Sequence, residues 1–238
     1  MAATRRVAIS QSNYIPWKGY FDLIRSVDLF LLYDEVQYTR RDWRNRNRIK
    51  TPAGVRWLSI PLQAKGNYYA RIDAMLIADR DWARGHWDRL RTAYREAPAF
   101  AEVEAEIRSW YREVAAAARL SDVNRALIEA VNAWLGIGTP VRFSTELDAE
   151  RPEDPTARLV ALCRAAEATE YVSGPAARAY LDEAAFADAG IRVRWADYGG
   201  YPEYPQLHPP FAHDVTVLDL LFHAGRDANR LMKGTVLA

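Results

Sequence analysis

Two short apolar runs near the start of the chain flank an amphipathic segment. Residues 6–10 (RVAIS) and 29–33 (LFLLY) are runs of apolar and β-branched side chains that end at polar positions. Between them, residues 19–27 carry apolar side chains at helical spacing. Strands that are buried on both faces of a parallel sheet have this continuous apolar pattern. The unit therefore predicts a strand, a right-handed crossover helix and a second, parallel strand.

The same alternation returns in the second half of the chain. Asp154 followed by Pro155 predicts an N-cap and the first position of a helix. Gly190 predicts the end of another helix. The expected strands are residues 140–145, 170–173 and 191–195, and the expected helices are residues 156–168 and 176–189. These elements predict an α/β fold with a Rossmann-like (HUP or nucleotidylyltransferase-like), mostly parallel sheet and helices on both faces.

The middle of the chain has a different pattern. Residues 79–136 are rich in helix formers with apolar stripes at helical spacing, and we expect their aromatic side chains to pack in a core. The sequence therefore predicts a helical insertion at residues 79–137, which separates the two halves of an α/β domain at residues 1–78 and 138–238.

Two smaller elements complete the prediction. Residues 46–61 contain β-prone runs on either side of a Pro-Ala-Gly turn, which predicts a hairpin appended to the sheet. Thr216 with Asp219 three positions later predicts a capping box at the start of a last helix.

Composition limits the function classes. The chain has 238 residues, of which 50% are hydrophobic and 26% charged, and its net charge is +1. A value so close to zero argues against binding to bulk nucleic acid or to an anionic membrane. The single cysteine, Cys163, excludes an internal disulfide, and the first residues lack the long apolar stretch of a signal peptide. We therefore expect a cytoplasmic protein with no membrane anchor.

Polar side chains follow the predicted strands at the edge where ligands bind in parallel sheets. After the first strand come Ser10, Gln11, Asn13 and Tyr14; after the second come Asp34, Gln37 and Tyr38; after a later one come Ser173 and Gly174. The turn at Ser173 and Gly174 precedes a predicted helix that begins with proline. Free backbone N–H groups there suit a phosphate or carboxylate, although a capped helix without a ligand is an equal alternative.

The densest basic run of the chain is residues 38–50 (YTRRDWRNRNRIK). Arginine grips phosphate or carboxylate with two parallel hydrogen bonds, and an interleaved aromatic ring can stack on a base or a sugar. Asn45, Arg46 and Asn47 are the substrate-binding candidates here. The alternative is a solvated basic loop.

Histidines and carboxylates supply the acid–base candidates. Asp34 follows a predicted buried strand, and His208 and His213 lie near Tyr204 and Gln206 in a proline-rich segment. The histidine spacings do not match a metal site, so we predict no metal. His223 lies on an apolar helix and Cys163 lies among alanines and leucines, which favours packing over chemistry for both.

A series of spaced blocks resembles the WbqC-like family, whose usual opening signature is close to HQPNYLPWLGYF. Residues 11–21 (QSNYIPWKGYF), which include Trp17, match that opening. Ser10 stands where the family commonly has histidine, and Ser12 where it commonly has proline. Further matching blocks are residues 34–38, 45–50, 57–61, 171–174, 180–181, 204–206 and 216–222.

The resemblance implies a biosynthetic transferase of the kind found in O-antigen and other surface-polysaccharide gene clusters. The implied reaction moves a glycyl-type aminoacyl or acyl group to an amine of a sugar-linked or natural-product acceptor. In this reading Asp34 or His213 deprotonates the amine, while Ser10, Gln11, Ser173 and Gly174 hold the donor or the developing oxyanion.

Two alternatives stay open at the level of sequence. The first is a nucleotide-using enzyme of HxGH type with Arg46 and Arg48 on the phosphates. Trp17 and Tyr20, however, occupy the two histidine positions of that motif. The second is a non-catalytic binder of a carrier-linked intermediate. The sequence indicates neither a cofactor nor an oligomeric state. The expected partner is a small-molecule or carrier-linked substrate. Nucleic acid is expected only in the form of a nucleotide or an aminoacyl donor.

Overall fold

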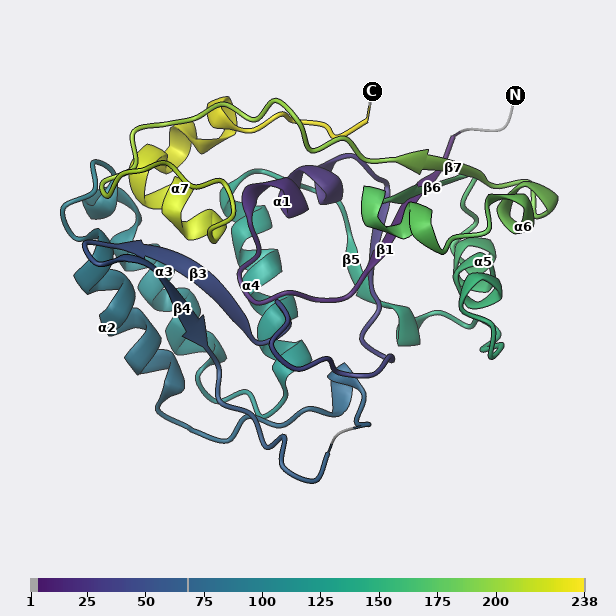
Figure 1. Ribbon diagram of the computed structural model, residues 1–238, viewed down its shortest axis with the longest axis horizontal. Helices are drawn as coiled ribbons and strands as arrows, with labels where there is room; N and C mark the ends of the chain where they lie inside the picture. Colours follow the sequence, from purple (N-terminus) through teal and green to yellow (C-terminus); the bar gives the residue numbers. More distant parts are fainter. Residues whose placement is uncertain (1–3, 68, 238) are drawn as a thin grey trace.

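A parallel β-sheet organises the two ends of the chain. The computed structural model describes residues 4–67 and 69–237. Within these residues five strands pair in the order β5-β2-β1-β6-β7, and each neighbouring pair is parallel (Figure 1). The strands are β1 (Arg6–Ser10), β2 (Leu29–Leu32), β5 (Val141–Phe143), β6 (Glu170–Ser173) and β7 (Arg192–Trp195).

Apolar cores cover both faces of this sheet. Alternate side chains of β1 and β2 point to opposite faces, so that Ala8 and Phe30 enter one core while Val7 and Leu29 enter the other. Helix α1 (Lys18–Arg25) covers the first face, and α5 (Pro155–Ala165) and α6 (Glu183–Asp188) cover the second. The predicted α/β class with a parallel sheet and helices on both faces is confirmed.

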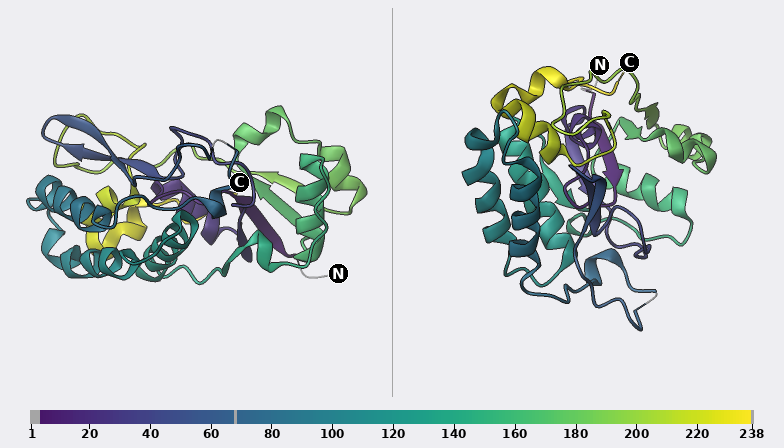
Figure 2. Two further views of the ribbon diagram at one scale, coloured as in Figure 1. Left: turned by 90° about the horizontal axis from the view of Figure 1, so that it is seen from below. Right: turned by 60° about the vertical axis from the view of Figure 1, so that its left-hand side comes forward.

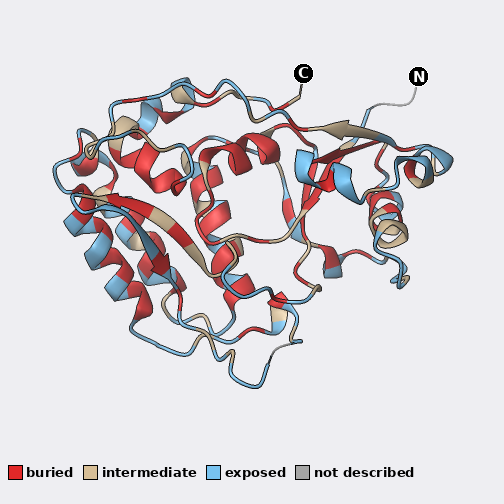
Figure 3. Ribbon diagram, viewed as in Figure 1, coloured by how far each residue is buried: buried red, intermediate tan, exposed pale blue. Residues whose placement is uncertain are grey.

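Three of the remaining helices lie within the predicted insertion. They are α2 (Trp82–Tyr94), α3 (Phe100–Val114) and α4 (Leu120–Trp134), and α7 (Val217–Ala224) packs with them (Figure 2). The apolar stripes of these helices are buried in the same core as α1, whereas the outer side of α2 is exposed (Figure 3). The boundaries at residues 79 and 137 stay a prediction, because one continuous core joins the helices to the sheet.

Short 3₁₀ helices occupy several connections. They are η1 (Ile72–Ala74), η2 (Ser144–Glu146), η3 (Pro175–Ala179) and η4 (Gly225–Leu231).

The predicted hairpin forms a sheet of its own. Strands β3 (Arg46–Thr51) and β4 (Gly54–Ser59) pair antiparallel around a turn in which Gly54 adopts φ 87°. The expectation that the hairpin joins the main sheet is wrong. Strand β3 instead contacts α2, and the carbonyl oxygen of Arg48 accepts a hydrogen bond from the backbone of Thr216 (2.9 Å). The hairpin therefore lies beside α7, next to the loop that precedes this helix.

Two predicted helical features are also wrong in detail. Residues 176–189 do not form one helix, because the Asp182 carboxylate accepts hydrogen bonds from the Ala184 and Ala185 backbone and starts α6 only at Glu183. The Thr216 hydroxyl caps α7 by accepting from the Leu218 backbone (3.2 Å). The reciprocal half of the capping box is missing, because other side chains engage the Asp219 carboxylate.

Within residues 4–67 and 69–237, no helix is both long and apolar enough to cross a membrane.

Candidate functional site

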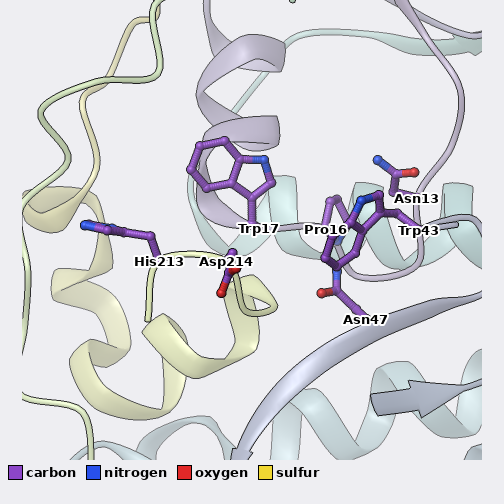
Figure 4. Close-up of a pocket in the computed structure, with 7 residues that line it drawn as sticks. All are labelled: Asn13, Pro16, Trp17, Trp43, Asn47, His213 and Asp214. Atoms are coloured by element: carbon purple, nitrogen blue, oxygen red, sulfur yellow. The ribbon is translucent and has the colours of Figure 1, made fainter. Parts of the chain in front are cut away.

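A pocket of about 270 Å³ lies where three distant segments meet. Its walls come from the loop after β1, from the start of the hairpin and from the loop before α7 (Figure 4). The lining residues are Asn13, Pro16, Trp17, Trp43, Asn47, His213 and Asp214. Four of them, Asn13, Trp17, Asn47 and His213, are substrate-binding or catalytic candidates from the sequence. Pro16, Trp43 and Asp214 were not among the candidates. Of these three, only Trp43 had a signal in the sequence, because it is an aromatic residue within the basic run.

The loop after β1 is clamped from two sides. The side-chain amide of Asn47 donates hydrogen bonds to the carbonyl oxygens of Tyr14 (3.0 Å) and Ile15 (2.8 Å). The Tyr14 backbone donates to the carbonyl oxygen of Trp43 (3.1 Å), and the Val217 backbone donates to that of Pro16 (2.9 Å). The hairpin and α7 therefore fix the loop that carries Asn13 and Trp17 into the pocket.

Aromatic rings support both indoles of the pocket. The Trp17 ring meets Tyr198 and Tyr201 edge-on, with ring centroids 5.4 Å apart in each case. The Trp43 ring lies against Trp57 at 5.2 Å. Such contacts hold each indole in one orientation, so that the pocket has preformed aromatic walls.

Arg48 joins the hairpin wall to the loop before α7. Its guanidinium group lies 5.3 Å from the Trp43 ring centroid and forms an ion pair with Asp214. Its Nε also donates to the carbonyl oxygen of Asp214 (3.1 Å). The pocket carboxylate is therefore neutralised by an arginine of the basic run.

His213 supplies the basic titratable group of the pocket, next to the carboxylate of Asp214. Its exposed imidazole rests edge-on against Phe211, with ring centroids 4.6 Å apart. Partial burial, together with the positive charge of Lys18, lowers the pKa of His213 below the usual value of 6.5. The imidazole is consequently neutral at pH 7 and able to accept a proton.

Lys18 fixes the segment that leads to His213. Its ammonium group is buried, donates to the carbonyl oxygen of Pro202 (2.9 Å) and lies 5.1 Å from the ring centroids of both Tyr201 and Tyr204. Burial lowers the pKa of Lys18 to about 8. The sequence did not single out this lysine, because one charged residue at the start of a helix carries no special pattern.

Tyr204 and Gln206, both predicted to bind substrate, hold the same segment from inside. The Tyr204 hydroxyl donates to the Asp219 carboxylate (2.7 Å), and the Gln206 amide donates to that carboxylate (2.9 Å). Gln206 also bonds both backbone groups of Ala212. Neither residue lines the pocket, so their contacts indicate a positioning role.

The histidines outside the pocket have structural partners. His223 accepts from the Leu207 backbone at Nε2 (2.7 Å) and donates to the Asp219 carbonyl oxygen at Nδ1 (2.6 Å). His208 Nε2 donates to the carbonyl oxygen of Ala93 (3.1 Å). The interpretation of His223 as a satisfied core residue agrees with these contacts.

Asp34 is buried away from the pocket. Its carboxylate accepts hydrogen bonds from the hydroxyls of Ser12 (2.7 Å) and Ser121 (2.6 Å) and from the Ser12 backbone (2.8 Å). Burial raises the pKa of Asp34, against the opposing effect of the two hydroxyls. The carboxylate ties β2 to the loop after β1 and to α4, so we assign no proton transfer in the pocket to it.

The other candidates after β1 and β2 are held by protein groups. The buried Tyr14 hydroxyl lies 2.7 Å from both His86 Nδ1 and the Tyr111 hydroxyl. His86 Nε2 donates to the Ser59 carbonyl oxygen (3.1 Å), which leaves Nδ1 to accept from Tyr14. Gln37 is exposed and forms an isolated antiparallel bridge with Arg71.

Tyr38, Asn45 and Arg46 support the hairpin rather than the pocket. The Tyr38 hydroxyl donates to the Asn45 side chain (2.8 Å), and Asn45 donates to the carbonyl oxygen of Ile60 (2.8 Å). The Arg46 guanidinium lies 4.0 Å from the Trp57 ring centroid. Arg44, Arg46 and Arg48 of the basic run are therefore stacked or bonded to protein groups, whereas Arg40 and Arg41 are exposed.

Ser10, Gln11, Ser173 and Gly174 form a second group at the edge of the sheet. Strands β1 and β6 are neighbours, so these residues meet at the carboxyl ends of the strands. The Gln11 carbonyl oxygen accepts from the Tyr20 hydroxyl (3.1 Å), and Ser10 makes a longer contact with it (3.5 Å). The turn at Gly174 leads only into η3, so the alternative of a turn without a ligand suits it better than an anion site.

Tyr198 connects this edge to the pocket. A side-chain carbon added at Gly174 would lie 4.0 Å from the Tyr198 ring, and the same ring contacts Trp17. The predicted candidates therefore fall into a pocket group and a sheet-edge group, separated by one aromatic ring.

Cys163 is fully buried in α5, and burial raises the pKa of its thiol to about 12. The thiol therefore packs in the core, as the sequence predicted.

Comparison with known proteins agrees with the spaced blocks. The sequence pattern of the WbqC-like protein family matches residues 11–231. The uncharacterized protein Rv1507c of Mycobacterium tuberculosis is 49% identical over 224 residues, which cover 94% of this chain and 96% of that protein. No solved structure matches the chain. Because the match includes the loop after β1, the hairpin and the segment before α7, which together build the pocket, the chain belongs to the WbqC-like protein family.

Proposed function

We propose that this protein is a biosynthetic transferase that moves an acyl or aminoacyl group to the amine of a small acceptor bound in the pocket. The observation that carries the proposal is His213, whose lowered pKa provides a neutral imidazole beside preformed aromatic walls. A neutral base next to a bound amine is what this reaction needs, because only the deprotonated amine attacks a carbonyl carbon.

The proposed reaction has a simple balance. The amine nitrogen attacks the donor carbonyl and forms an amide bond, and His213 takes the proton that the nitrogen loses. The bond to the donor's leaving group then breaks, and the protonated imidazole returns the proton to that leaving group. General base catalysis of this kind contributes about 10²- to 10⁴-fold to the rate.

An amino sugar is the acceptor class that the pocket favours. Indoles such as Trp17 and Trp43 stack on the apolar face of a sugar ring, while Asn13 and Asp214 provide polar groups for hydroxyls. A cavity of about 270 Å³ suits one ring and its substituent. The donor would then approach from the sheet edge at Ser10, Gln11 and Ser173, beyond the Tyr198 ring.

We also infer a Rossmann-like type for the sheet. If the five strands of this sheet are renumbered in chain order, their arrangement in the sheet reads 3-2-1-4-5, and the order reverses beside β1. In open parallel sheets ligands bind at such a reversal, outside the carboxyl ends of the strands. Ser10 and Gln11 follow β1 at this point, which supports a ligand there.

A matched pair of sugars tests the proposal. UDP-glucosamine and UDP-N-acetylglucosamine differ in whether the nitrogen is a free amine, and saturation-transfer NMR reports which sugar protons contact the protein. We expect contacts from the glucosamine ring and about tenfold weaker binding to Trp17→Ala. Absence of ring contacts for both sugars would overturn the acceptor class.

The catalytic role needs a separate measurement. With glycyl-tRNA or acetyl-CoA as donor, mass spectrometry detects acylation of the amine. We expect His213→Gln to bind the sugar normally and to lose turnover by about a hundredfold or more. Full turnover by this variant would exclude His213 as the base.

A further inference from the structure

A second groove, far along the chain from the pocket residues, runs between α2 and α3. Its volume is about 510 Å³. Ala83, Trp87, Tyr111 and Ala115 contribute an apolar floor, and charged side chains line its sides. The two helices lie side by side in Figures 1 and 2, at the end of the molecule opposite α5 and α6. The groove is therefore an external feature of the helical part.

Arginines dominate the sides of this groove. Arg84 and Arg91 come from α2, and Arg108 and Arg112 come from α3, and all four are exposed. Arg84 has a long contact with Asp81 (3.4 Å), whereas the other three form no ion pair within residues 4–67 and 69–237. Unpaired guanidinium groups that line one groove create a local positive potential on a chain whose net charge is +1.

Two carboxylates also line the groove, and they offset only part of this charge. Asp88 lies on α2 between the arginines, and Glu104 lies on α3. Neither forms an ion pair with a groove arginine among the described residues. The lining thus has four cationic groups and two anionic ones, and an anionic ligand is favoured.

The arginines are spread along the groove rather than gathered at a point. A rise of 1.5 Å per residue separates Arg84 from Arg91 by about 10 Å along α2, and Arg108 from Arg112 by about 6 Å along α3. The short connection between the helices makes them antiparallel, so the Arg84 end of α2 lies beside the Arg112 end of α3. The four charges therefore outline a stripe.

We propose that the groove between α2 and α3 docks an acidic amphipathic helix of a partner protein. Carboxylates four and seven residues apart on such a helix are separated by about 6 Å and about 10 Å along its axis, which are the intervals of the groove arginines on α3 and α2. Trp87 and Tyr111 at the floor are themselves almost fully buried (7% and 2% exposed), so the apolar side chains of such a helix would rest on the aliphatic stems of the groove arginines.

Other anions fit this geometry less well. A single phosphate requires convergent donors, and the arginines are too widely spaced to converge on one group. An anionic membrane is flat, whereas these arginines line a concave groove with an apolar floor. The proposal goes beyond the transferase function and does not depend on it.

Calorimetry with a synthetic peptide tests the docking site. The probe is a short helical peptide with glutamates at helical spacing on one face and leucines beside them, and the comparison is a scrambled peptide of equal composition. We expect the first peptide to bind and the scrambled one to bind about tenfold more weakly, with affinity falling as salt rises. Equal binding of both peptides would show a generic charge effect and overturn the proposal.

Charge reversal locates the site. We expect Arg91→Glu combined with Arg108→Glu to weaken peptide binding by about tenfold or more. The matched control is Arg89→Glu on α2 with Arg95→Glu just after the helix, which makes the same charge change at exposed positions outside the groove lining, and it should retain most of the affinity. Equal loss in both variants contradicts the site.

Competing ligands complete the test. Tripolyphosphate that binds as tightly as the peptide and needs the same arginines would reassign the groove to a small anion. Phosphatidylserine vesicles that bind in the same way would reassign it to a membrane surface. The absence of peptide binding to the wild-type protein would also overturn the proposal. Sugar binding in the pocket of the double variant separates these outcomes from any failure of the transferase proposal.

Discussion

The side-chain amide of Asn47 lies 2.8 Å from the carbonyl oxygen of Ile15, a fully buried β-branched residue held at φ 35°. Side chains branched at Cβ rarely adopt this left-handed conformation, and such strain costs on the order of 1–3 kcal/mol. A residue of the hairpin therefore stabilises a strained turn in the loop after β1. That turn directs Trp17 into the pocket.

Replacing Asn47 with alanine should destabilise the protein and disorder the pocket. The substitution leaves the carbonyl oxygens of Tyr14 and Ile15 without their buried donor, which costs about 1–3 kcal/mol. We expect denaturant unfolding to show this loss in the free energy of unfolding, and sugar binding by NMR to weaken.

Asn45→Ala provides the matched control. Asn45 makes side-chain hydrogen bonds within the hairpin region but none to the loop after β1. We expect this variant to lose stability and to keep sugar binding. If it loses binding as much as Asn47→Ala does, the specific link between Asn47 and the strained turn is wrong.

Asp34 should make stability depend on pH with a defined sign. Its raised pKa means that the folded state binds the proton more tightly than the unfolded state, where the value is 3.8. The contribution of this group is therefore fully present below pH 3.8 and is lost as the pH rises through the folded-state pKa. We expect the free energy of unfolding of Asp34→Asn to fall less over this rise than that of the wild type.

Ser121→Ala tests the cause of this effect. The Ser121 hydroxyl favours the ionised carboxylate, so its removal should raise the pKa of Asp34 further. The pH dependence of unfolding should then extend to higher pH than in the wild type. Identical pH profiles for the wild type and Asp34→Asn would show that Asp34 does not contribute.

Lys18→Met should raise the pKa of His213. Two effects lower this pKa: partial burial is the larger, and the positive charge of Lys18 is the second. Methionine keeps most of the side-chain volume of lysine without its charge. NMR titration of the four histidine ring signals, with His213→Gln for assignment, gives the measurement. The acid limb of the rate profile should move to higher pH by the same amount.

Lys65→Met is the control for this titration, because Lys65 is exposed and has no electrostatic effect on His213. We expect the His213 signal to titrate as in the wild type. A similar shift in both lysine variants would point to a general change in charge rather than to Lys18.

Gly19→Ala should displace the Trp17 indole. A Cβ atom at Gly19 would lie 2.3 Å from the Trp17 ring, closer than real contacts allow. The side chain of Trp17 can rotate away, so we expect the fold to survive and sugar binding to fall by about tenfold. Circular dichroism and the NMR binding assay measure the two effects.

Gly85→Ala is the matched helical control. A Cβ atom at Gly85 meets no heavy atom within 4 Å, so alanine should raise stability by about 0.5–1 kcal/mol through its better helix propensity. Sugar binding should not change. Normal binding by Gly19→Ala would show that Trp17 does not form the wall of an occupied site.

The local elements could be predicted because their patterns depend on near neighbours. The continuous apolar run at β2 and the spacing on α1 determined both elements within a few residues. Asp154 was expected to cap α5, and its carboxylate does accept from the Ala157 backbone (2.7 Å). The break at Asp182 was missed, because alanine-rich sequence favours helix on both sides of it.

The candidate site was predicted only in part. Polar residues after the strands were all expected to face one site, yet Asp34 is buried by contacts with Ser12 and with Ser121 of α4. Tyr204 and Gln206 are engaged by Asp219 of α7. These partners come from other elements of the fold. The local sequence around a polar residue therefore does not predict whether such a partner will bury it or bond to it.

By itself, the sequence determined the α/β class, the order of the elements and the polar segments from which a site could be built, since hydrophobic periodicity and capping are local properties. Only the tertiary structure decided that Trp17, Trp43 and His213 share one pocket. Contacts between segments as distant as the loop after β1 and the loop before α7 depend on how the helices and the hairpin pack. That packing is set by the shape of the whole core, which no single stretch of sequence specifies.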